Sequence, residues 1–333
     1  MKLSRFGAVA LAAILSAASL GSAARAETQL KALAAWSTTL PLVPEVFYKF
    51  QEAATKASNG EITFQNTGPE TVPPFEQLEP LSQGVFDVVF QSSAYHQAQT
   101  GMGVALQNLI DLDPAKLRQS GMLDWLNDYY RKNFGVVILS AYSTGPTTFV
   151  LTKPLDGDTT LAGRKIRTNA SYEGVVRALG GAPVAMSPAD AYAAMQKGTL
   201  DGAAWPSSST ADFKLYEVAK YMTAPNFSQG CNLILMNAAK FDALPKNIQD
   251  ALLEAGKQTD VHGTAYGVSQ VTSQDEIMKK NGVQITEFSP EIAAKIAKLD
   301  IEGAVEVAHR SHPEDVDAAL ALAKEKGVLL GQK

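Results

Sequence analysis

Arg167 and Trp205 are the two residues of this chain whose types and positions could bind an anion. Arg167 ends a short alternating run typical of a β-strand, and Trp205 ends a later run of the same kind. A guanidinium group is planar and always charged, and it can hold a carboxylate through two parallel hydrogen bonds. An Arg and a Trp at two strand ends therefore predict the floor of an anion-binding cleft.

The residues between these two side chains predict a parallel α/β unit. Asn169 can cap a helix that ends at Gly180, and Ser187 can cap a second helix that ends at Gly198. The order strand, helix, strand, helix, strand with tight connections favours a parallel sheet. Ligands bind beyond the carboxyl ends of the strands in such sheets, so both side chains should lie on the same rim.

The first third of the chain predicts another α/β unit with candidate ligand contacts at its strand ends. A strand over residues 30–35 leads to Trp36, and a strand over residues 85–90 leads to Ser92 and Tyr95. An aromatic residue in an α/β protein also has a plainer role in the core. Position at a strand end makes the two roles about equally favoured.

Three ordered runs resemble one known family. The chain is similar to the periplasmic solute-binding proteins of TRAP transporters, which are tripartite, ATP-independent uptake systems. The likeness extends over nearly all of the mature chain. The runs are GRKIR at 163–167, LGGAPV at 179–184 and YAAMQKGTLDG at 192–202, with shorter landmarks GVFDV at 84–88, TKPL at 152–155 and FDALP at 241–245.

The resemblance implies an α/β clamshell of two lobes, joined by hinge strands and spanned by one long helix. The segment from Pro245 towards Gly282 is the candidate for that helix, although its three internal glycines speak against one straight helix. A terminal helix is expected over residues 290–308. The expected first lobe comprises residues 27–146 and 230–270, and the second lobe comprises residues 147–229 and 271–333.

The family's carboxylate-binding arginine matches Arg167, while other family positions depart from the pattern. Thr147 stands where sugar-acid binders often have a second Arg, and Trp205 stands where they commonly have Asn. Trp36 also replaces a polar contact. Ser92 and Tyr95 occupy positions that are acidic or basic in sialic-acid binders.

These departures favour a flat ligand with one carboxylate over a sugar acid or a dicarboxylate. We expect an aromatic or aromatic 2-oxo acid, with Arg167 at its carboxylate and Trp36, Tyr95 and Trp205 around its body. Phe75 is a weaker candidate contact. An aliphatic 2-oxo or hydroxy acid is the alternative. Ala204 replaces the metal-binding Glu of a related branch, so we expect no metal and no other cofactor.

Arg167 has an alternative role as one partner of a structural ion pair. Glu173 and Asp201 lie close enough in the sequence to be its partner. Without the family resemblance the two roles are equally favoured, because buried arginines serve structural pairs as readily as ligands.

The amino terminus predicts export. Lys2 and Arg5 precede an apolar run over residues 6–20, and Ala24-Arg25-Ala26 supplies a cleavage site, so residues 1–26 are expected to be a signal peptide. Its removal would turn a chain of 333 residues and net charge −5 into an acidic periplasmic protein. That balance excludes nucleic acid as an expected partner. We expect a monomer whose partners are a small organic acid and the membrane permease subunits.

An enzyme is the less favoured alternative. Cys231 is the single cysteine, lies in an apolar run and is expected to be a buried, inert thiol. His309 and His312 are the only close histidine pair, and no third metal ligand accompanies them. Nucleophile-elbow, P-loop and zinc-protease motifs are absent from the sequence. A periplasmic hydrolase therefore has little support, and a sensor input that shares the same cleft stays open.

Overall fold

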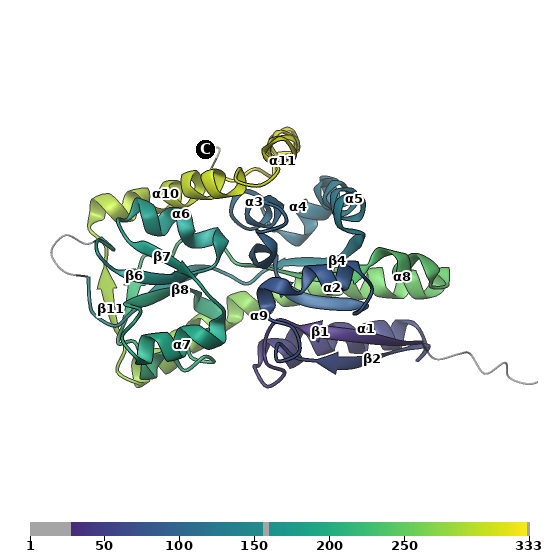
Figure 1. Cartoon of the computed structure of the whole chain (residues 1–333), viewed down its shortest axis with the longest axis horizontal. Coiled ribbons are helices and arrows are strands. Elements are labelled where there is room, and N and C mark those ends of the chain that lie inside the picture. Colours follow the sequence, from purple (N-terminus) through teal and green to yellow (C-terminus); the bar gives the residue numbers. More distant parts are fainter. Residues whose placement is uncertain (1–27, 156–159, 332–333) are drawn as a thin grey trace, which may run out of the picture.

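Two α/β lobes lie side by side along the long axis of the molecule (Figure 1). The computed structural model describes residues 28–155 and 160–331, so the expected signal peptide lies outside the described residues. Each lobe is built on one sheet. The strand orders are β2-β1-β3-β10-β4 in the first lobe and β11-β9-β5-β8-β6-β7 in the second.

In the first sheet, β1 pairs in parallel with β2 and β3, and β10 runs antiparallel between β3 and β4. The strands are β1 (Thr28–Ala34), β2 (Ile62–Thr67), β3 (Val88–Ser92), β4 (Val136–Ser143) and β10 (Cys231–Asn237). The helical segments of this part are η1 (Val43–Tyr48), α1 (Lys49–Ala57), η2 (Pro74–Glu76), α2 (Leu78–Ser82), η3 (Ser93–His96), α3 (Met102–Leu109), α4 (Pro114–Gln119), α5 (Met122–Phe134) and α8 (Ala238–Ala243).

In the second sheet, β6 pairs in parallel with β7 and β8, while β5 runs antiparallel to β8 and β9. The strands are β5 (Thr147–Leu151), β6 (Lys165–Thr168), β7 (Ala182–Ala185), β8 (Gly202–Pro206), β9 (Tyr221–Ala224) and β11 (Gln284–Glu287). The helical segments are α6 (Ala170–Ala178), α7 (Pro188–Gln196), η4 (Ser207–Ser209), η5 (Leu215–Glu217), α9 (Lys246–Lys280), α10 (Pro290–Ala308) and α11 (Pro313–Glu325).

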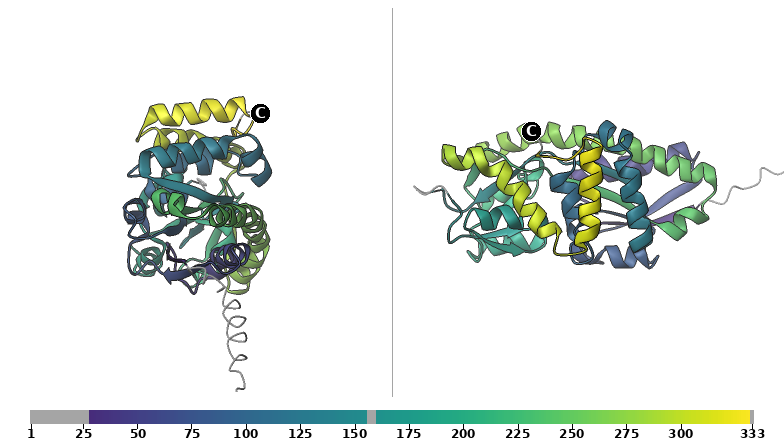
Figure 2. Two further views of the ribbon diagram at one scale, coloured as in Figure 1. Left: turned by 90° about the vertical axis from the view of Figure 1, so that its right-hand side faces the viewer. Right: turned by 90° about the horizontal axis from the view of Figure 1, so that it is seen from above.

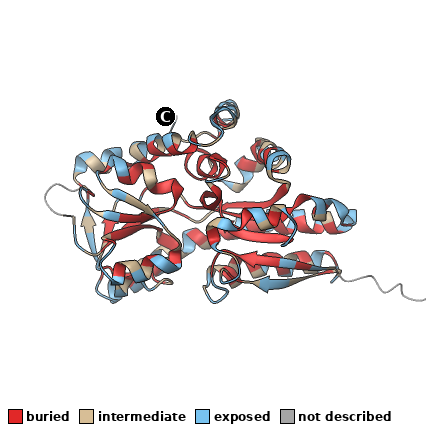
Figure 3. Ribbon diagram, viewed as in Figure 1, coloured by how far each residue is buried: buried red, intermediate tan, exposed pale blue. Residues whose placement is uncertain are grey.

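Alternate residues of the strands feed hydrophobic cores on both faces of each sheet. In β1, Leu33 joins one core of the first lobe, while Leu30 and Ala32 join the other. This alternation follows from the two-residue period of a strand. Figure 3 shows the result, because the sheets are mostly buried and the outer helix faces are exposed.

The expected parallel unit around Arg167 is present. Asn169 caps α6 by accepting a hydrogen bond from the backbone of Ser171, and Ser187 caps α7 through the backbone of Asp190. Since β6 and β8 are parallel, their carboxyl ends lie at one edge of the sheet. Arg167 and Trp205 therefore share one rim, as the sequence predicted.

Two short crossing segments connect the lobes beside each other. One joins β4 to β5, and the other, residues 225–230, joins β9 to β10. Backbone hydrogen bonds tie them together, from Thr144 to Gly230 and from Gly230 to Gly145. Gly145 has a φ of +85°, which only glycine adopts readily. These segments form the hinge.

The long helix α9 is one continuous element of 35 residues that packs on α1 and β4 of the first lobe and on η4 of the second. Figure 2 shows it running along both lobes. Its glycines allow close packing and do not break it. A Cβ atom at Gly256 would lie 1.9 Å from the Leu139 carbonyl oxygen, and one at Gly263 would lie 2.7 Å from the Tyr142 ring. The expectation that these glycines interrupt the helix was wrong.

The carboxyl terminus departs from the expected lobe division, which gave residues 271–333 to the second lobe. Helix α10 packs on α6 of the second lobe and on α3 of the first, and is followed by α11, which packs on α3 and α5. Val316, Ala319 and Ala323 of α11 are buried in a core of the first lobe. Their i, i+3, i+7 spacing makes one apolar helix face, and the first lobe covers it.

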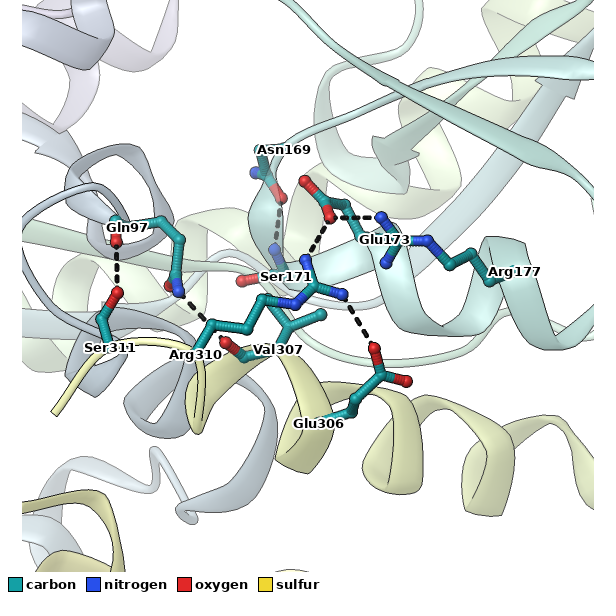
Figure 4. A network of polar contacts seen from close by, with 9 residues as sticks. All are labelled: Gln97, Asn169, Ser171, Glu173, Arg177, Glu306, Val307, Arg310 and Ser311. Atoms are coloured by element: carbon teal, nitrogen blue, oxygen red, sulfur yellow. Dashed lines mark hydrogen bonds and ion pairs between the residues drawn. The ribbon is translucent and has the colours of Figure 1, made fainter. Parts of the chain in front are cut away.

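The elbow between α10 and α11 ties the two lobes together at their edge (Figure 4). Arg310 pairs with Glu173 of α6 at 2.8 Å and with Glu306 at 2.9 Å. On the other side, Gln97 of the first lobe donates to the carbonyl oxygen of Val307 at 3.1 Å. The last two helices therefore bridge the lobes on a side away from the strand ends.

Candidate ligand-binding site between the lobes

A cavity lies between the lobes at the ends of the strands. Trp36, Ser92 and Tyr95 line it from the first lobe, and Arg167 and Trp205 line it from the second. The space open to the centres of water-sized spheres is about 70 Å³. Because one water needs about 10–15 Å³ by this measure, the cavity has room for a small molecule.

Arg167 is a buried cation with one unused donor. Its side chain is 2% exposed, its Nε donates to the Met186 carbonyl oxygen at 3.0 Å, and its Nη1 donates to the Ala204 carbonyl oxygen at 3.4 Å. Its Nη2 is buried without an acceptor in the described structure. Burial lowers the pKa of Arg167, but a guanidinium stays charged at neutral pH. The group is thus placed to receive an anion.

The acidic residues proposed as structural partners of Arg167 are engaged elsewhere. Glu173 pairs with Arg177 and Arg310, and a carboxylate oxygen of Asp201 accepts from the backbone of Lys165 at 2.8 Å. In the described part of the chain, no carboxylate lies within ion-pair distance of Arg167. The structural ion pair is therefore not formed.

Aromatic rings surround the guanidinium. The Cζ of Arg167 lies 4.8 Å from the centre of the Trp205 ring, a cation–π arrangement. Phe213 contacts Trp205 edge to face at 4.8 Å between ring centres. Trp205 also has a buried Nε1 without an acceptor among the described residues. The second lobe therefore offers two unpaired donors beside a ring wall.

Tyr95 brings the first lobe close to Arg167. Burial raises the pKa of Tyr95, while the nearby guanidinium of Arg167 and the indole of Trp36 act in the opposite direction. The Trp36 and Tyr95 rings are 5.9 Å apart. This electrostatic contact across the lobes indicates that the structure has the lobes together.

Thr147 and Phe75 stand behind the cavity wall and do not line it. Thr147 is fully buried in β5, where its hydroxyl donates to the Tyr172 hydroxyl at 3.1 Å. Phe75 packs edge to face on Tyr95 at 4.9 Å. Each therefore supports a lining residue, so a direct contact from either one is no longer favoured.

Several lining residues were missed from the sequence. Gln107 comes from α3, Asn232 from β10, and Phe213 from the loop after η4. Asn232 donates to the Tyr142 hydroxyl at 3.1 Å, which holds both side chains at the wall. The one available signal was the amide of Gln107 within an otherwise apolar helical run. Strand-end reasoning could not find a helix side or an antiparallel strand.

Cys231 lines the cavity as a protonated thiol. It is buried, and burial raises its pKa to about 12. A thiol reacts as the thiolate, so this group is inert at neutral pH. Its character matches the expectation from the sequence.

The histidine pair near the carboxyl terminus does not form a shared metal site. The ring nitrogens of His309 contact the Val305 carbonyl oxygen and the Asp317 carboxylate. His312 instead lies near Glu314 and Asp315 on the surface, where exposed acidic groups are common without an ion. The expected absence of a metal stays a prediction.

The comparison with protein families decides the class of this chain. The model of the bacterial extracellular solute-binding protein family 7 matches residues 34–300. The chain belongs to this family. The resemblance to the TRAP solute-binding proteins is thereby confirmed, and with it the two-lobed fold. Members of the family are receptors for transport and not enzymes.

Relatives and solved structures agree with this family. The C4-dicarboxylate-binding periplasmic protein DctP of Rhodobacter capsulatus is 27% identical over 157 residues, 46% of each chain. A TRAP periplasmic solute-binding protein from Desulfovibrio salexigens with bound orotic acid has a TM-score of 0.79 and 19% identity, covering 90% of this chain and 98% of that one. A Bordetella pertussis extracytoplasmic solute receptor binding pyroglutamic acid has a TM-score of 0.78 and 15% identity, covering 89% and 99%.

The solute-binding protein is thus the periplasmic receptor of a TRAP transporter, which takes up small organic acids with membrane permease components. Within residues 28–155 and 160–331, no helix combines the length and apolar character needed to cross a membrane.

Proposed function

We propose that this receptor captures a small organic monocarboxylate with a flat, apolar body and delivers it to its permease. An aromatic acid or an aromatic 2-oxo acid is the form that we favour. The carboxylate pairs with Arg167, and the body lies against Trp36, Tyr95 and Trp205. The single observation that carries this proposal is the buried Arg167, whose Nη2 lacks an acceptor while its side chain lines the cavity.

The charge of the cavity wall supports a single carboxylate. Among the described residues that line it, Arg167 is the only cation, and there is no Asp, Glu, Lys or His. A buried charge is strongly unfavourable unless it is paired. One cation can pair with one carboxylate, whereas the second carboxylate of a dicarboxylate would be buried without a partner.

The ring wall supports the flat body. Trp36, Tyr95, Trp205 and Phe213 line the cavity, and aromatic faces favour offset or edge contacts with another ring. The two similar receptors of known structure bind orotic acid and pyroglutamic acid, each of which has one carboxyl group on a ring. An aliphatic 2-oxo or hydroxy acid is the second candidate, since the cavity of about 70 Å³ suits a compact molecule.

Calorimetric titration with a panel of acids tests this proposal. The panel contains benzoate, phenylacetate, phenylpyruvate, 2-oxobutyrate, succinate and glucuronate. We expect an aromatic monocarboxylate to bind most tightly, and the two-carboxylate and sugar acids to bind weakly. Tight binding of succinate or glucuronate alone would overturn the ligand class.

Substitution of Arg167 tests the role of the guanidinium. A hydrogen bond to a charged group is worth about 1.5–3 kcal/mol, so Arg167→Ala should weaken binding of the best acid at least about tenfold. Arg167→Lys keeps the charge but loses the two-pronged geometry, and should recover only part of the affinity. Arg177→Ala is the matched control, because Arg177 is exposed on α6 and does not line the cavity. Unchanged binding by Arg167→Ala would refute the assignment.

A further inference from the structure

Two neighbouring amides on helix α3 have opposite situations. Gln107 and Asn108 are 1% and 2% exposed in a helix whose residues are all buried. The Nδ2 of Asn108 donates to the Ser228 hydroxyl at 2.9 Å, to the Ser171 carbonyl oxygen at 3.2 Å, and lies 3.3 Å from both carboxylate oxygens of Asp300. Asn108 therefore has a structural task at the junction of the lobes.

Gln107 has no such task for its donor. Its Nε2 is buried and has no acceptor in the described structure, and the residue lines the cavity between the lobes. Buried donors in folded proteins nearly always have a partner, so each exception needs an explanation. A ligand oxygen in the cavity would be the missing acceptor.

The position of Gln107 separates it from the carboxylate site. The unpaired donors of Arg167 and Trp205 both come from the second lobe, on β6 and β8. Gln107 comes from α3 of the first lobe and lines the same cavity. A ligand whose carboxylate is held by the second lobe satisfies the first-lobe donor only if it carries another oxygen.

We propose that Gln107 determines specificity by donating its Nε2 hydrogen to a carbonyl or hydroxyl oxygen of the ligand, separate from the carboxylate held by Arg167. The receptor therefore selects oxo and hydroxy acids over acids that lack this oxygen. This inference rests on the proposed function and narrows its ligand class.

The same contact gives the ligand a hold on both lobes. Arg167 engages one end from the second lobe, and Gln107 engages the added oxygen from the first. An acid without the oxygen leaves the Gln107 donor buried and unpaired in the closed form. A site built to bond a ligand oxygen rejects the analogue without it more strongly than an apolar pocket rejects a change of size.

Matched pairs of acids test the proposal by calorimetry. Phenylpyruvate and 3-phenylpropanoate differ only by an oxo group, and 2-oxobutyrate and butyrate differ in the same way. We expect the wild-type receptor to bind the oxo acid at least about tenfold more tightly than its partner in the pair that fits. A wild-type receptor that binds both members equally would overturn the proposal without any variant.

Gln107→Met keeps the length and burial of the side chain but removes the donor. It should lower affinity for the oxo acid by about 10- to 100-fold, the equivalent of about 1–3 kcal/mol, and change affinity for the deoxy acid less than about twofold. Gln77→Met is the matched control. Gln77 is fully buried and donates to the carbonyl oxygens of Ala34 and Val72, away from the cavity. Its change should leave the preference intact.

The outcomes separate this inference from the proposed function. An equal loss for both acids in Gln107→Met would place Gln107 on the carboxylate or in the fold, and would refute the specificity role. If Gln107→Met does not fold, Gln107→Asn withdraws the donor while keeping an amide, and the same loss of preference is expected. If no monocarboxylate binds, or Arg167→Ala binds as well as wild type, the proposed function itself fails.

Discussion

Arg167 is held by the protein in a form that only a ligand completes. Two of its nitrogens donate to carbonyl oxygens that fix its direction, and the third has no acceptor. The ring of Trp205 lies against the guanidinium and keeps water from one of its faces. Preorganisation of this kind lowers the cost of ordering the site when an anion arrives.

A second buried charge, Asp300, gives the receptor a measurable pH dependence. Burial raises the pKa of Asp300 from 3.8 to about 7, and hydrogen bonds from Ser228 and Asn108 act in the opposite direction. Between these values the folded state keeps a proton that the unfolded state releases. This group's contribution to stability is therefore complete below about pH 4 and is lost as the pH rises through 7.

Asp300→Asn should remove that loss. We expect the variant to be more stable than wild type at pH 8 by about a few kcal/mol, with the difference shrinking towards pH 4. Urea unfolding at both pH values measures this, and Asp124→Asn, at an exposed position of α5, controls for removal of one acid. A variant less stable than wild type at pH 8 would show that Asp300 is needed in its charged form.

The sequence predicted residues that meet at strand ends and missed those that meet in other ways. Arg167 and Trp205 could be placed together because parallel strands end at one edge of a sheet. Gln107 and Asn232 reach the cavity from a helix and an antiparallel strand, whose positions depend on contacts distant in the sequence. Local pattern does not determine such contacts.

At the scale of elements, the glycines of α9 set the distance between the long helix and strand β4. Gly256 is the clearest case, since a Cβ atom would lie 1.9 Å from the backbone oxygen of Leu139. Propensity alone would make Gly256→Ala stabilising by about 1 kcal/mol. The clash is with backbone and cannot be relieved by moving a side chain, so overpacking should dominate.

We therefore expect Gly256→Ala to lower the free energy of unfolding by about 1–3 kcal/mol or more. Thermal unfolding followed by circular dichroism measures the change. Thr272→Ala, at an exposed position of the same helix, is the control for propensity. A rise in the unfolding temperature of Gly256→Ala would mean that α9 and β4 are less closely packed than described.

Element type was more predictable than element partnership. Hydrophobic spacing predicted the helix at 290–308 and the capped helices on either side of β7, and all are present. The lobe to which the carboxyl terminus belongs was not predictable. The apolar face of α11 shows that it needs a partner surface, but the fold decides that α3 and α5 supply it.

At the scale of the molecule, closure of the two lobes around the ligand is the expected working motion. Tyr95 of the first lobe and Arg167 of the second interact directly, and the hinge consists of two short crossing segments. A ligand shifts the equilibrium only by the contacts that it gains in the closed form. Because the cavity wall comes from both lobes, such contacts exist.

Tryptophan fluorescence should report this closure. Trp36 and Trp205 line the cavity from different lobes, whereas Trp125 lies on α5 against Tyr129. We expect a saturable change on adding ligand that is reduced in Trp36→Phe and Trp205→Phe and retained in Trp125→Phe. Small-angle scattering should show a smaller radius of gyration with ligand. An unchanged profile at saturating ligand would contradict closure.

The most direct measurement of the central claim is the coupling between the ligand's carboxylate and Arg167. The best-bound acid and its neutral primary amide are titrated into wild type and Arg167→Ala by calorimetry, which completes a double-mutant cycle. We predict that the acid is preferred at least about tenfold by wild type and that this preference disappears in Arg167→Ala. An equal preference for the acid in both proteins would show that another group binds the carboxylate and would contradict the account.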